Sequence, residues 1–135
     1  MRIMAVDYGE QRTGVAFSDL TGSIAGEAFV VAEWNADRLA EKLASEAKAR
    51  DVSLIVVGHP LKTDGTSGGR AELSEAFCGL LEAASGLPCL LWDERFTTVD
   101  AHRILHQNGR REKKHRKNVD AVAATLILEG YLNSI

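Results

Sequence analysis

The sequence has only two cysteines, and no apolar run in it approaches the roughly 20 residues that a membrane-spanning helix needs. Cys78 and Cys89 lie in apolar segments, with no CxxC or Cys/His pair at ligand spacing, so we expect buried thiols rather than a disulfide or a zinc site. Asp7 and Gly9 interrupt the first residues, MRIMAVDYGE, which is typical of a core strand and not of a signal peptide. We therefore expect a soluble, cytoplasmic protein without a membrane partner.

An excess of positive charge is also missing, because the formal net charge is -3. The charge is unevenly distributed, however, since the run RREKKHRK at residues 110–117 has six basic side chains and one acid. A basic patch on an acidic body indicates one localised anionic partner, which we expect to be nucleic acid. We expect a mobile loop that guides the substrate, and a merely solvated loop is the alternative. Its basic residues are Arg110, Arg111, Lys113, Lys114, Arg116 and Lys117.

The length of 135 residues and the 45% hydrophobic content suit one ordinary domain over residues 1–135. The first three predicted strands are close together, which is typical of an antiparallel meander. The last two are nearly continuous apolar runs, as expected of strands buried on both faces. The five predicted strands are residues 3–8, 13–18, 24–32, 52–58 and 89–93.

Four segments have the spacing of amphipathic helices. We expect one to begin after Asn35, a second to end at Gly86, a third to begin at Thr97 and the last to begin after Asn118. On the second helix, the predicted apolar face consists of Leu73, Ala76, Phe77, Leu80, Leu81 and Ala84. The order predicts an α/β fold, with a five-stranded mixed sheet and helices on both faces. Right-handed crossovers would place the first strand beside the two later parallel strands.

Acidic residues occupy the ends of these elements, where ligands of such sheets bind. Asp7 ends the first strand, Asp93 and Glu94 end the last strand, and Asp120 is in the first turn of the last helix. Each has a local alternative role, namely turn amides for Asp7, an ion pair with Arg95 for either neighbouring acid, and the helix dipole for Asp120. Together they form an oxygen-ligand set suited to Mg²⁺ or Mn²⁺, and two such ions can promote phosphodiester hydrolysis.

Four blocks of the sequence carry a family resemblance, namely AVDYGEQRTGVAFSD, VVGHPLKTDGTSGGRAE, WDERFTTVDA and KNVDAVAATLIL. In this order and spacing they resemble the YqgF (RuvX) family, described as Holliday-junction resolvases or pre-16S rRNA nucleases. The resemblance implies a ribonuclease H-like fold and a metal-dependent endonuclease. It also assigns the acidic catalytic and metal-binding positions to Asp7, Glu94 and Asp120, and thereby chooses Glu94 over Asp93. His59 departs from the pattern, and we expect it to be a surface residue rather than a substrate contact.

Further candidates surround these acids. In the loop HPLKTDGTSGGR, the free amides together with Lys62 and Arg70 could receive a phosphate, although a plain surface loop is the alternative. Arg12 and Arg95 could orient an acid or bind a phosphate, and the sequence does not separate these roles. We expect both tryptophans, Trp34 and Trp92, to be core residues, and His102 and His106 to be surface residues.

The substrate follows from the resemblance alone, as either the 5′ end of the 16S rRNA precursor or a four-way DNA junction. Symmetric cutting of a junction needs a dimer, and we expect a monomer because no helix appears to have a spare apolar stripe. This favours the RNA. Two other classes compete, a catalytically silent nucleic-acid-binding module and an actin-like ATPase suggested by DYGEQRTG, for whose two lobes the chain is short.

Overall fold

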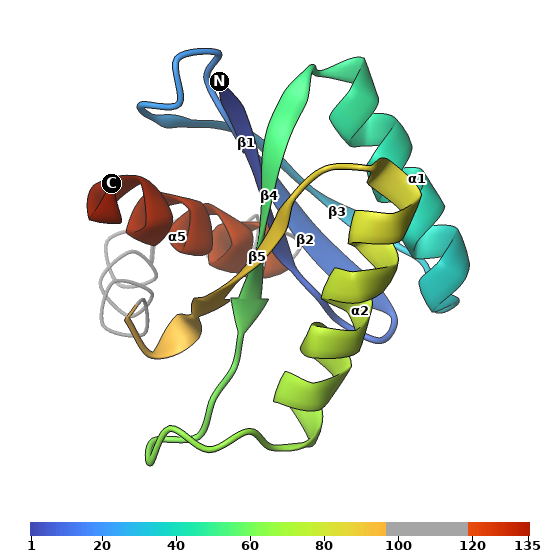
Figure 1. Ribbon diagram of the computed structural model, residues 1–135, viewed down its shortest axis with the longest axis vertical. Helices are drawn as coiled ribbons and strands as arrows, with labels where there is room; N and C mark the ends of the chain where they lie inside the picture. The colour runs from blue at the N-terminus through green and yellow to red at the C-terminus, as the bar shows by residue number, and fades with distance from the viewer. Residues whose placement is uncertain (97–118) are drawn as a thin grey trace.

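The computed structural model describes residues 1–96 and 119–135, and the side chains of Phe96, Val119 and Asp120 lie outside that description. Within these residues, five strands form one mixed sheet in the order β3-β2-β1-β4-β5 (Figure 1). β1 pairs antiparallel with β2 and parallel with β4, β2 pairs antiparallel with β3, and β4 pairs parallel with β5. The strands are β1 (Arg2–Asp7), β2 (Arg12–Ser18), β3 (Ala25–Ala32), β4 (Val52–His59) and β5 (Cys89–Asp93).

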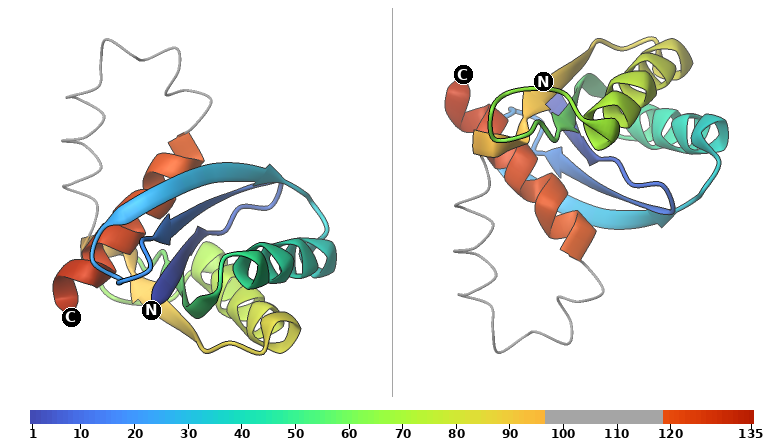
Figure 2. Two further views of the ribbon diagram at one scale, coloured as in Figure 1. Left: turned by 90° about the horizontal axis from the view of Figure 1, so that it is seen from above. Right: turned by 90° about the horizontal axis from the view of Figure 1, so that it is seen from below.

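Helices cover both faces of this sheet, as the sequence predicts (Figure 2). α1 (Ala36–Ala49) and α2 (Gly69–Ser85) pack on one face, and α5 (Val119–Ser134) crosses the other. A short 3-10 helix, η1 (Glu94–Phe96), follows β5. None of the helices within the described residues is long and apolar enough to span a lipid bilayer.

The alternation of side chains along β1 divides the core into two clusters. Met4 and Val6 face α1 and α2, whereas Ile3 and Ala5 face α5. The strand boundaries agree with the sequence prediction to within one residue, and the meander and the parallel pairings are confirmed. The predicted third helix, the basic run and the Asn118 cap lie outside the described residues.

α1 confirms its sequence prediction and α2 corrects one. The side chain of Asn35 accepts a hydrogen bond from the Arg38 amide (3.0 Å) at the start of α1. On α2, however, Leu73 and Leu80 are 42% and 38% exposed, and Ala76 and Ala84 are also exposed. The helix lies on α1 and the sheet through a narrower arc, formed by Ala71, Ser74, Phe77, Cys78 and Leu81. The expectation that no helix has spare apolar residues is therefore wrong for α2.

The two tryptophans differ, although both were expected in the core. Trp92 packs against the α5-side cluster, edge-on to Tyr131 with ring centroids 5.9 Å apart. Trp34 is 71% exposed, and its assignment to the core is wrong. It lies in the short loop between the end of β3 and the Asn35 cap of α1. Cys78 is buried and Cys89 is half-buried, and both are free thiols.

Candidate functional site

The candidate site lies at the edge of the sheet where β1, β3, β4 and β5 all end. These four strands run in the same direction, because β1 is parallel to β4, β4 is parallel to β5, and β3 is related to β1 by two antiparallel pairings. Val6 pairs with Val57, so Asp7 and Gly58 are the next residues along neighbouring strands. Gly58 pairs with Trp92, two residues before Glu94. The register thus brings the ends bearing Asp7, Gly58 and Glu94 together at one edge (the carboxyl edge).

Residues at this edge alternate between the two faces of the sheet. Because side chains alternate along a strand, Asp7 is on the same face of the sheet as Ile3 and Ala5, which belong to the cluster beneath α5. Tyr8, the next residue, points to the opposite face and stacks on Phe77 of α2, with ring centroids 4.4 Å apart. This stack anchors the end of β1 to α2 and leaves Asp7 on the α5 face.

Gly58 provides the space that Glu94 occupies. A Cβ at position 58 would lie 2.9 Å from Glu94 Cδ and 2.6 Å from Ile127 Cδ1 of α5. The glutamate therefore lies directly over the backbone of β4, on the face covered by α5. Any larger residue at position 58 would displace the side chains of Glu94 and Ile127. The side chains that come close to Gly58 are those of Glu94 and Ile127.

The surroundings of Glu94 disfavour its negative charge. Burial raises the pKa of the Glu94 carboxyl above its usual range, and the negative charge of Asp93 acts in the same direction. The charges of Arg70 and His59 oppose this increase without cancelling it. A carboxylate held in such a position gains from a cation beside it, which is the property expected of a metal ligand.

The neighbouring acid, Asp93, has a different environment. Its carboxylate accepts hydrogen bonds from Arg95, at 2.6 Å from Nη2 and at 3.0 Å from the backbone amide. These bonds lower the pKa of Asp93. Of the two acids that the sequence left able to pair with Arg95, it is Asp93 that forms this ion pair.

The turn after Asp7 is fixed by Thr13. The Gly9 amide donates a hydrogen bond to Thr13 Oγ1 (3.2 Å), and the same hydroxyl donates to the Gly9 carbonyl oxygen (3.2 Å). A Cβ at Gly9 would lie 2.1 Å from the Arg12 carbonyl oxygen, so the turn requires glycine. Of the turn amides considered as alternative partners of Asp7, that of Gly9 is bound by the Thr13 hydroxyl.

The glycine-rich loop between β4 and α2 lies beside the same edge, at the lower end of the molecule in Figure 1. It turns at Gly65 (φ +86°), whose amide donates to the Lys62 carbonyl oxygen (2.8 Å). The Arg95 guanidinium lies against this turn, with Nη1 3.3 Å from where a Gly65 Cβ would be. Arg95 therefore connects the loop to Asp93.

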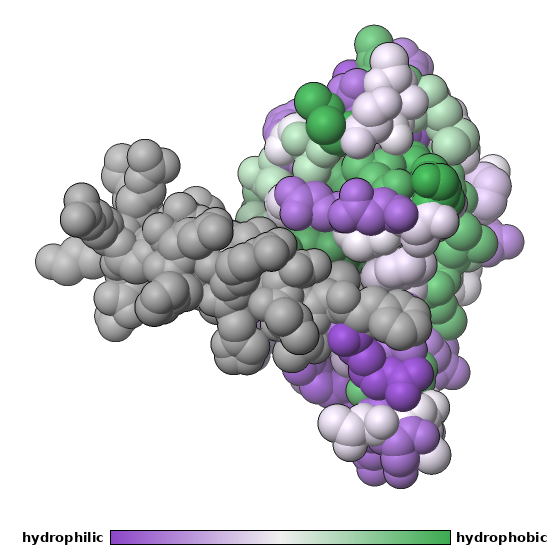
Figure 3. Space-filling view, turned by 90° about the vertical axis from the view of Figure 1, so that its left-hand side faces the viewer, coloured by the Kyte–Doolittle hydropathy of each residue, from purple (hydrophilic) through white to green (hydrophobic). Residues whose placement is uncertain are grey.

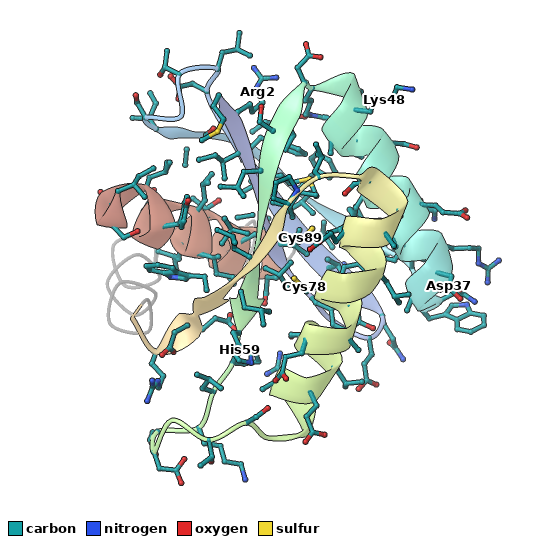
Figure 4. All side chains as sticks on the ribbon, in the orientation of Figure 1. Arg2, Asp37, Lys48, His59, Cys78 and Cys89 are labelled. Carbon is teal, nitrogen blue, oxygen red and sulfur yellow. The ribbon has the colours of Figure 1, made fainter. Side chains whose placement is uncertain are left out.

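His59 ties the start of α2 to the end of β4 (Figure 4). Its Nε2 lies 2.9 Å from Glu75 Oε2 of α2, and Ser67 Oγ donates to the same oxygen (2.8 Å). These contacts lower the pKa of Glu75. The expectation of a plain surface histidine overlooked this link, because Glu75 is 16 residues away in the sequence.

The predicted cationic residues are placed in two groups. Arg12, Lys62, Arg70 and Arg95 are exposed, at the start of β2, in the loop, at the start of α2 and in η1. Within residues 1–96 and 119–135, ion pairing involves Arg95 but neither Arg12, Lys62 nor Arg70. The second group, Arg110, Arg111, Lys113, Lys114, Arg116 and Lys117, lies outside the described residues.

Asp120 is in the first turn of α5, four residues before Ala124 and seven before Ile127, both buried against the sheet. Its side chain is not among those described, so the structure does not test whether it joins Asp7 and Glu94. Among the described side chains, no three His, Cys, Asp or Glu residues are grouped as a metal site would require.

Sequence reasoning missed Trp34 at this edge. The residue follows β3, whose carboxyl end lies at the same edge as that of β1. The signal available in the sequence was its position between Glu33 and the helix cap Asn35, in a polar loop rather than in a strand.

Comparison with known proteins assigns residues 1–134 to one protein family. The family model RuvX, described as Holliday junction resolvase, matches residues 1–134. A protein from Syntrophus aciditrophicus, named for a proposed role as a pre-16S rRNA nuclease, is 43% identical over 100% of this chain and 90% of its own length.

Solved structures agree on the fold. RuvC from T. thermophilus in complex with a Holliday junction substrate has a TM-score of 0.63 at 13% identity, over 99% of this chain and 96% of RuvC. The Fowlpox virus resolvase with junction DNA also has a TM-score of 0.63, at 12% identity over 99% of this chain and 98% of the resolvase. The sheet order and helical layers are thus those of the ribonuclease H-like fold.

Proposed function

Because the chain belongs to the RuvX family, we propose that it is a metal-dependent endonuclease that hydrolyses nucleic-acid phosphodiester bonds. The observation that carries this proposal is Glu94, a buried carboxylate with a raised pKa, placed over Gly58 at the same edge as Asp7. The net direction of the shift supports a ligand role, because burial outweighs the opposing charges of Arg70 and His59 at Glu94, whereas the pKa of the neighbouring Asp93 is lowered.

Asp7, Glu94 and Asp120 are proposed to hold two divalent ions, Mg²⁺ or Mn²⁺. When bound, such ions supply activation of the attacking water and stabilisation of the leaving oxygen. The protein's own contribution is positional. Gly58 admits Glu94, and the Tyr8–Phe77 stack holds the end of β1 in place. The three carboxylates must be ionised to act as ligands, so cleavage should rise with pH through the raised pKa of Glu94.

Substrate binding is assigned to the surrounding cations. Arg12, Lys62, Arg70 and Arg95 are proposed to contact phosphates close to the acids. The basic run at 110–117 is proposed to guide the same strand, since phosphate contacts supply most non-specific affinity. We propose that this takes place in the cytoplasm, with no membrane partner.

The proposed substrate is the 5′ end of the 16S rRNA precursor. Its support is the proposed role for which the relative from Syntrophus aciditrophicus is named. A four-way DNA junction is the second candidate, favoured by the description of the family and by the likeness to RuvC. We still propose a monomer. The main argument for a monomer was the lack of spare apolar surface on the helices, and exposed Leu73 and Leu80 contradict that argument. The choice of RNA therefore no longer depends on the oligomeric state.

The proposal is tested by replacing each acid with its amide. Asp7→Asn, Glu94→Gln and Asp120→Asn should each lower cleavage by more than about a hundredfold with Mg²⁺ or Mn²⁺, while the protein stays folded. Asp93→Asn is the matched control, because its carboxylate holds Arg95, and it should lose much less. Both substrates, precursor rRNA and a four-way junction, are assayed with purified protein. Full metal-dependent activity in Asp7→Asn would refute the mechanism.

A further inference from the structure

Trp34 has no packing role that accounts for it. An apolar residue just before a helix cap commonly packs on the fourth helical residue, here Leu39. Leu39 is only 1% exposed, yet the Trp34 side chain leaves 71% of its surface in water. The indole contacts Arg38 instead, whose guanidinium carbon lies 5.3 Å from the ring centroid. This contact engages one face of the ring.

The position of Trp34 places it at the carboxyl edge with the candidate acids. Asp7, Gly14 and Val30 are aligned across β1, β2 and β3. Trp34 follows Val30 by four residues and continues toward the same edge. Strand spacing and rise place it within about 16 Å of Asp7, which is a few nucleotides along a single strand. The other exposed apolar residues on the β2–β3 hairpin, Leu20 and Ile24, lie at the opposite edge.

One acid and two cations lie beside Trp34. Glu33 forms ion pairs with Lys42 (3.0 Å) and with Arg38 (3.8 Å), and these contacts hold its pKa below the usual range. The ring borders a shallow hollow lined by Gln11, Ala32 and Glu33, where the Glu33 amide donates to the Gln11 carbonyl oxygen (3.0 Å). The exposed indole thus offers a flat apolar surface beside cations, which suits a ligand that combines a flat ring with negative charge.

We propose that Trp34, backed by Arg38, is a stacking platform for an unpaired base of the nucleic acid that the edge cleaves. This inference rests on the proposed nuclease function and adds a binding position to it. Aromatic rings stack on bases of any sequence, because every base has a flat π-face. Bases within a duplex already stack on one another, so the platform selects single-stranded segments.

Three variants of the full chain test the platform. Binding of a fluorescein-labelled 12-nucleotide single-stranded RNA and of its duplex is measured by anisotropy, with a metal chelator present to prevent cleavage. Trp34→Ala should weaken single-strand binding about five- to a hundredfold and leave duplex binding unchanged. Trp34→Phe should retain most of the affinity, since a phenyl ring also stacks. Leu20→Ala, which removes a comparably exposed apolar side chain at the opposite edge, should bind as the wild type does.

Two further readouts distinguish stacking from charge. The dependence of affinity on salt should be the same for Trp34→Ala and wild type, because no phosphate contact is lost. In a Trp92→Phe background, Trp34 is the only remaining tryptophan, and its fluorescence should be quenched by the single strand. Unchanged single-strand affinity in Trp34→Ala, equal losses in Trp34→Ala and Trp34→Phe, or an equal loss for duplex would each overturn the platform.

Failure of the platform is distinguishable from failure of the nuclease proposal. The binding assay contains no metal and requires no cleavage, so it reports on Trp34 even if the acids prove inactive. Conversely, if Trp34→Ala binds single strands like the wild type while the wild type still cleaves RNA with Mn²⁺, only the platform is refuted. If Trp34 instead contacts a protein partner, Trp34→Ala would also bind single strands as the wild type does, and this result would refute the platform.

Discussion

The two ends of the sheet differ in how they accommodate ionised side chains, and the difference lies in one residue, Glu94. At the amino end of β1, Arg50 pairs with Glu27 (2.9 Å) and with Glu46, and its guanidinium lies 4.5 Å from the Phe17 ring centroid. These contacts raise the pKa of Arg50 and lower that of Glu27. In the nearby hairpin, Thr21 and the amides of Ser23 and Ile24 lower the pKa of Asp19 to about 2. Charges at this end are neutralised by the protein itself.

At the carboxyl edge, one carboxyl group is kept where its charge is disfavoured, since burial raises the pKa of Glu94. In Figure 3 the lower end of the molecule, where the loop between β4 and α2 lies, is mostly hydrophilic, and the larger apolar areas of this face lie above it. The direction of a carboxyl group's pKa shift thus separates a charge that its surroundings stabilise from one that they disfavour. Asp93 and Glu94, adjacent in sequence, show the same contrast within one edge.

The largest effect should follow from Gly58→Ala, which alters the carboxyl edge without removing any charge. The new methyl group would lie 2.9 Å from Glu94 Cδ and 2.6 Å from Ile127 Cδ1, so the carboxylate must move. A displacement of about 1 Å can cost a hundredfold in rate, and overpacking should lower the free energy of unfolding by about 1–3 kcal/mol. Cleavage assays and urea unfolding measure the two effects.

Gly79→Ala is the matched control for that substitution. Gly79 lies within α2, and a Cβ there would meet no atom within 4 Å. The change should stabilise the protein by about 0.5–1 kcal/mol, because alanine favours a helix, and should leave cleavage unchanged. If Gly58→Ala cleaved as well as Gly79→Ala, the close approach of Glu94 to β4 would have no role in the reaction.

Arg50→Ala, at the amino end, should have a smaller effect, which concerns stability and not cleavage. The variant loses two ion pairs and the packing of the guanidinium on Phe17 and Phe29, which should lower the free energy of unfolding by about 1–2 kcal/mol. Cleavage by the folded protein should be unchanged. Lys48→Ala, at an exposed cation in the same turn of α1, should alter stability by less than about 0.5 kcal/mol. Reduced cleavage in Arg50→Ala would break the proposed division between the two ends.

The sequence predicted the sheet well because its signals are local. Apolar runs defined all five strands, the Asn35 cap defined the start of α1, and chain order with right-handed crossovers placed β1 beside β4. The ends of β1 and β5 followed from this order, which is why Asp7 and Glu94 could be expected at one edge. Choosing Glu94 over Asp93 needed the family resemblance, since spacing alone does not distinguish them.

What the sequence could not predict depends on contacts between distant residues. Arg50 and Glu27 are 23 positions apart, and His59 and Glu75 are 16 apart, so neither pair leaves a local pattern. The sequence also could not predict which apolar residues of α2 are exposed. Leu73 and Phe77 both fit a helical stripe, and only the packing on α1 decides which of them is buried. Trp34 was assigned to the core because it lacks the clustered aromatic neighbours of a base-stacking platform, whereas its position in a loop decides its exposure.

The smallest effect concerns stability without metal, and its sign distinguishes the two neighbouring acids. Burial raises the pKa of Glu94 in the folded protein above its ordinary value of 4.5, so the folded state binds this proton more tightly than the unfolded state does. The stabilisation is full below pH 4.5 and is lost as the pH rises through the raised pKa. Glu94→Gln, which cannot ionise, should therefore melt higher than the wild type at pH 8, and the difference should shrink toward pH 4.

Asp93→Asn should behave in the reverse way in the same melting experiments, run in a metal chelator. Arg95 lowers the pKa of Asp93 below 3.8, so its contribution to stability is present above that pH and is lost as the pH falls through the lowered pKa. The asparagine variant should thus melt slightly below the wild type at pH 8. A Glu94→Gln variant that melts below the wild type at pH 8 would mean that the ionised carboxylate stabilises the fold. Glu94 would then belong with the self-neutralised charges at the amino end, and its place in a metal site would lose its physical basis.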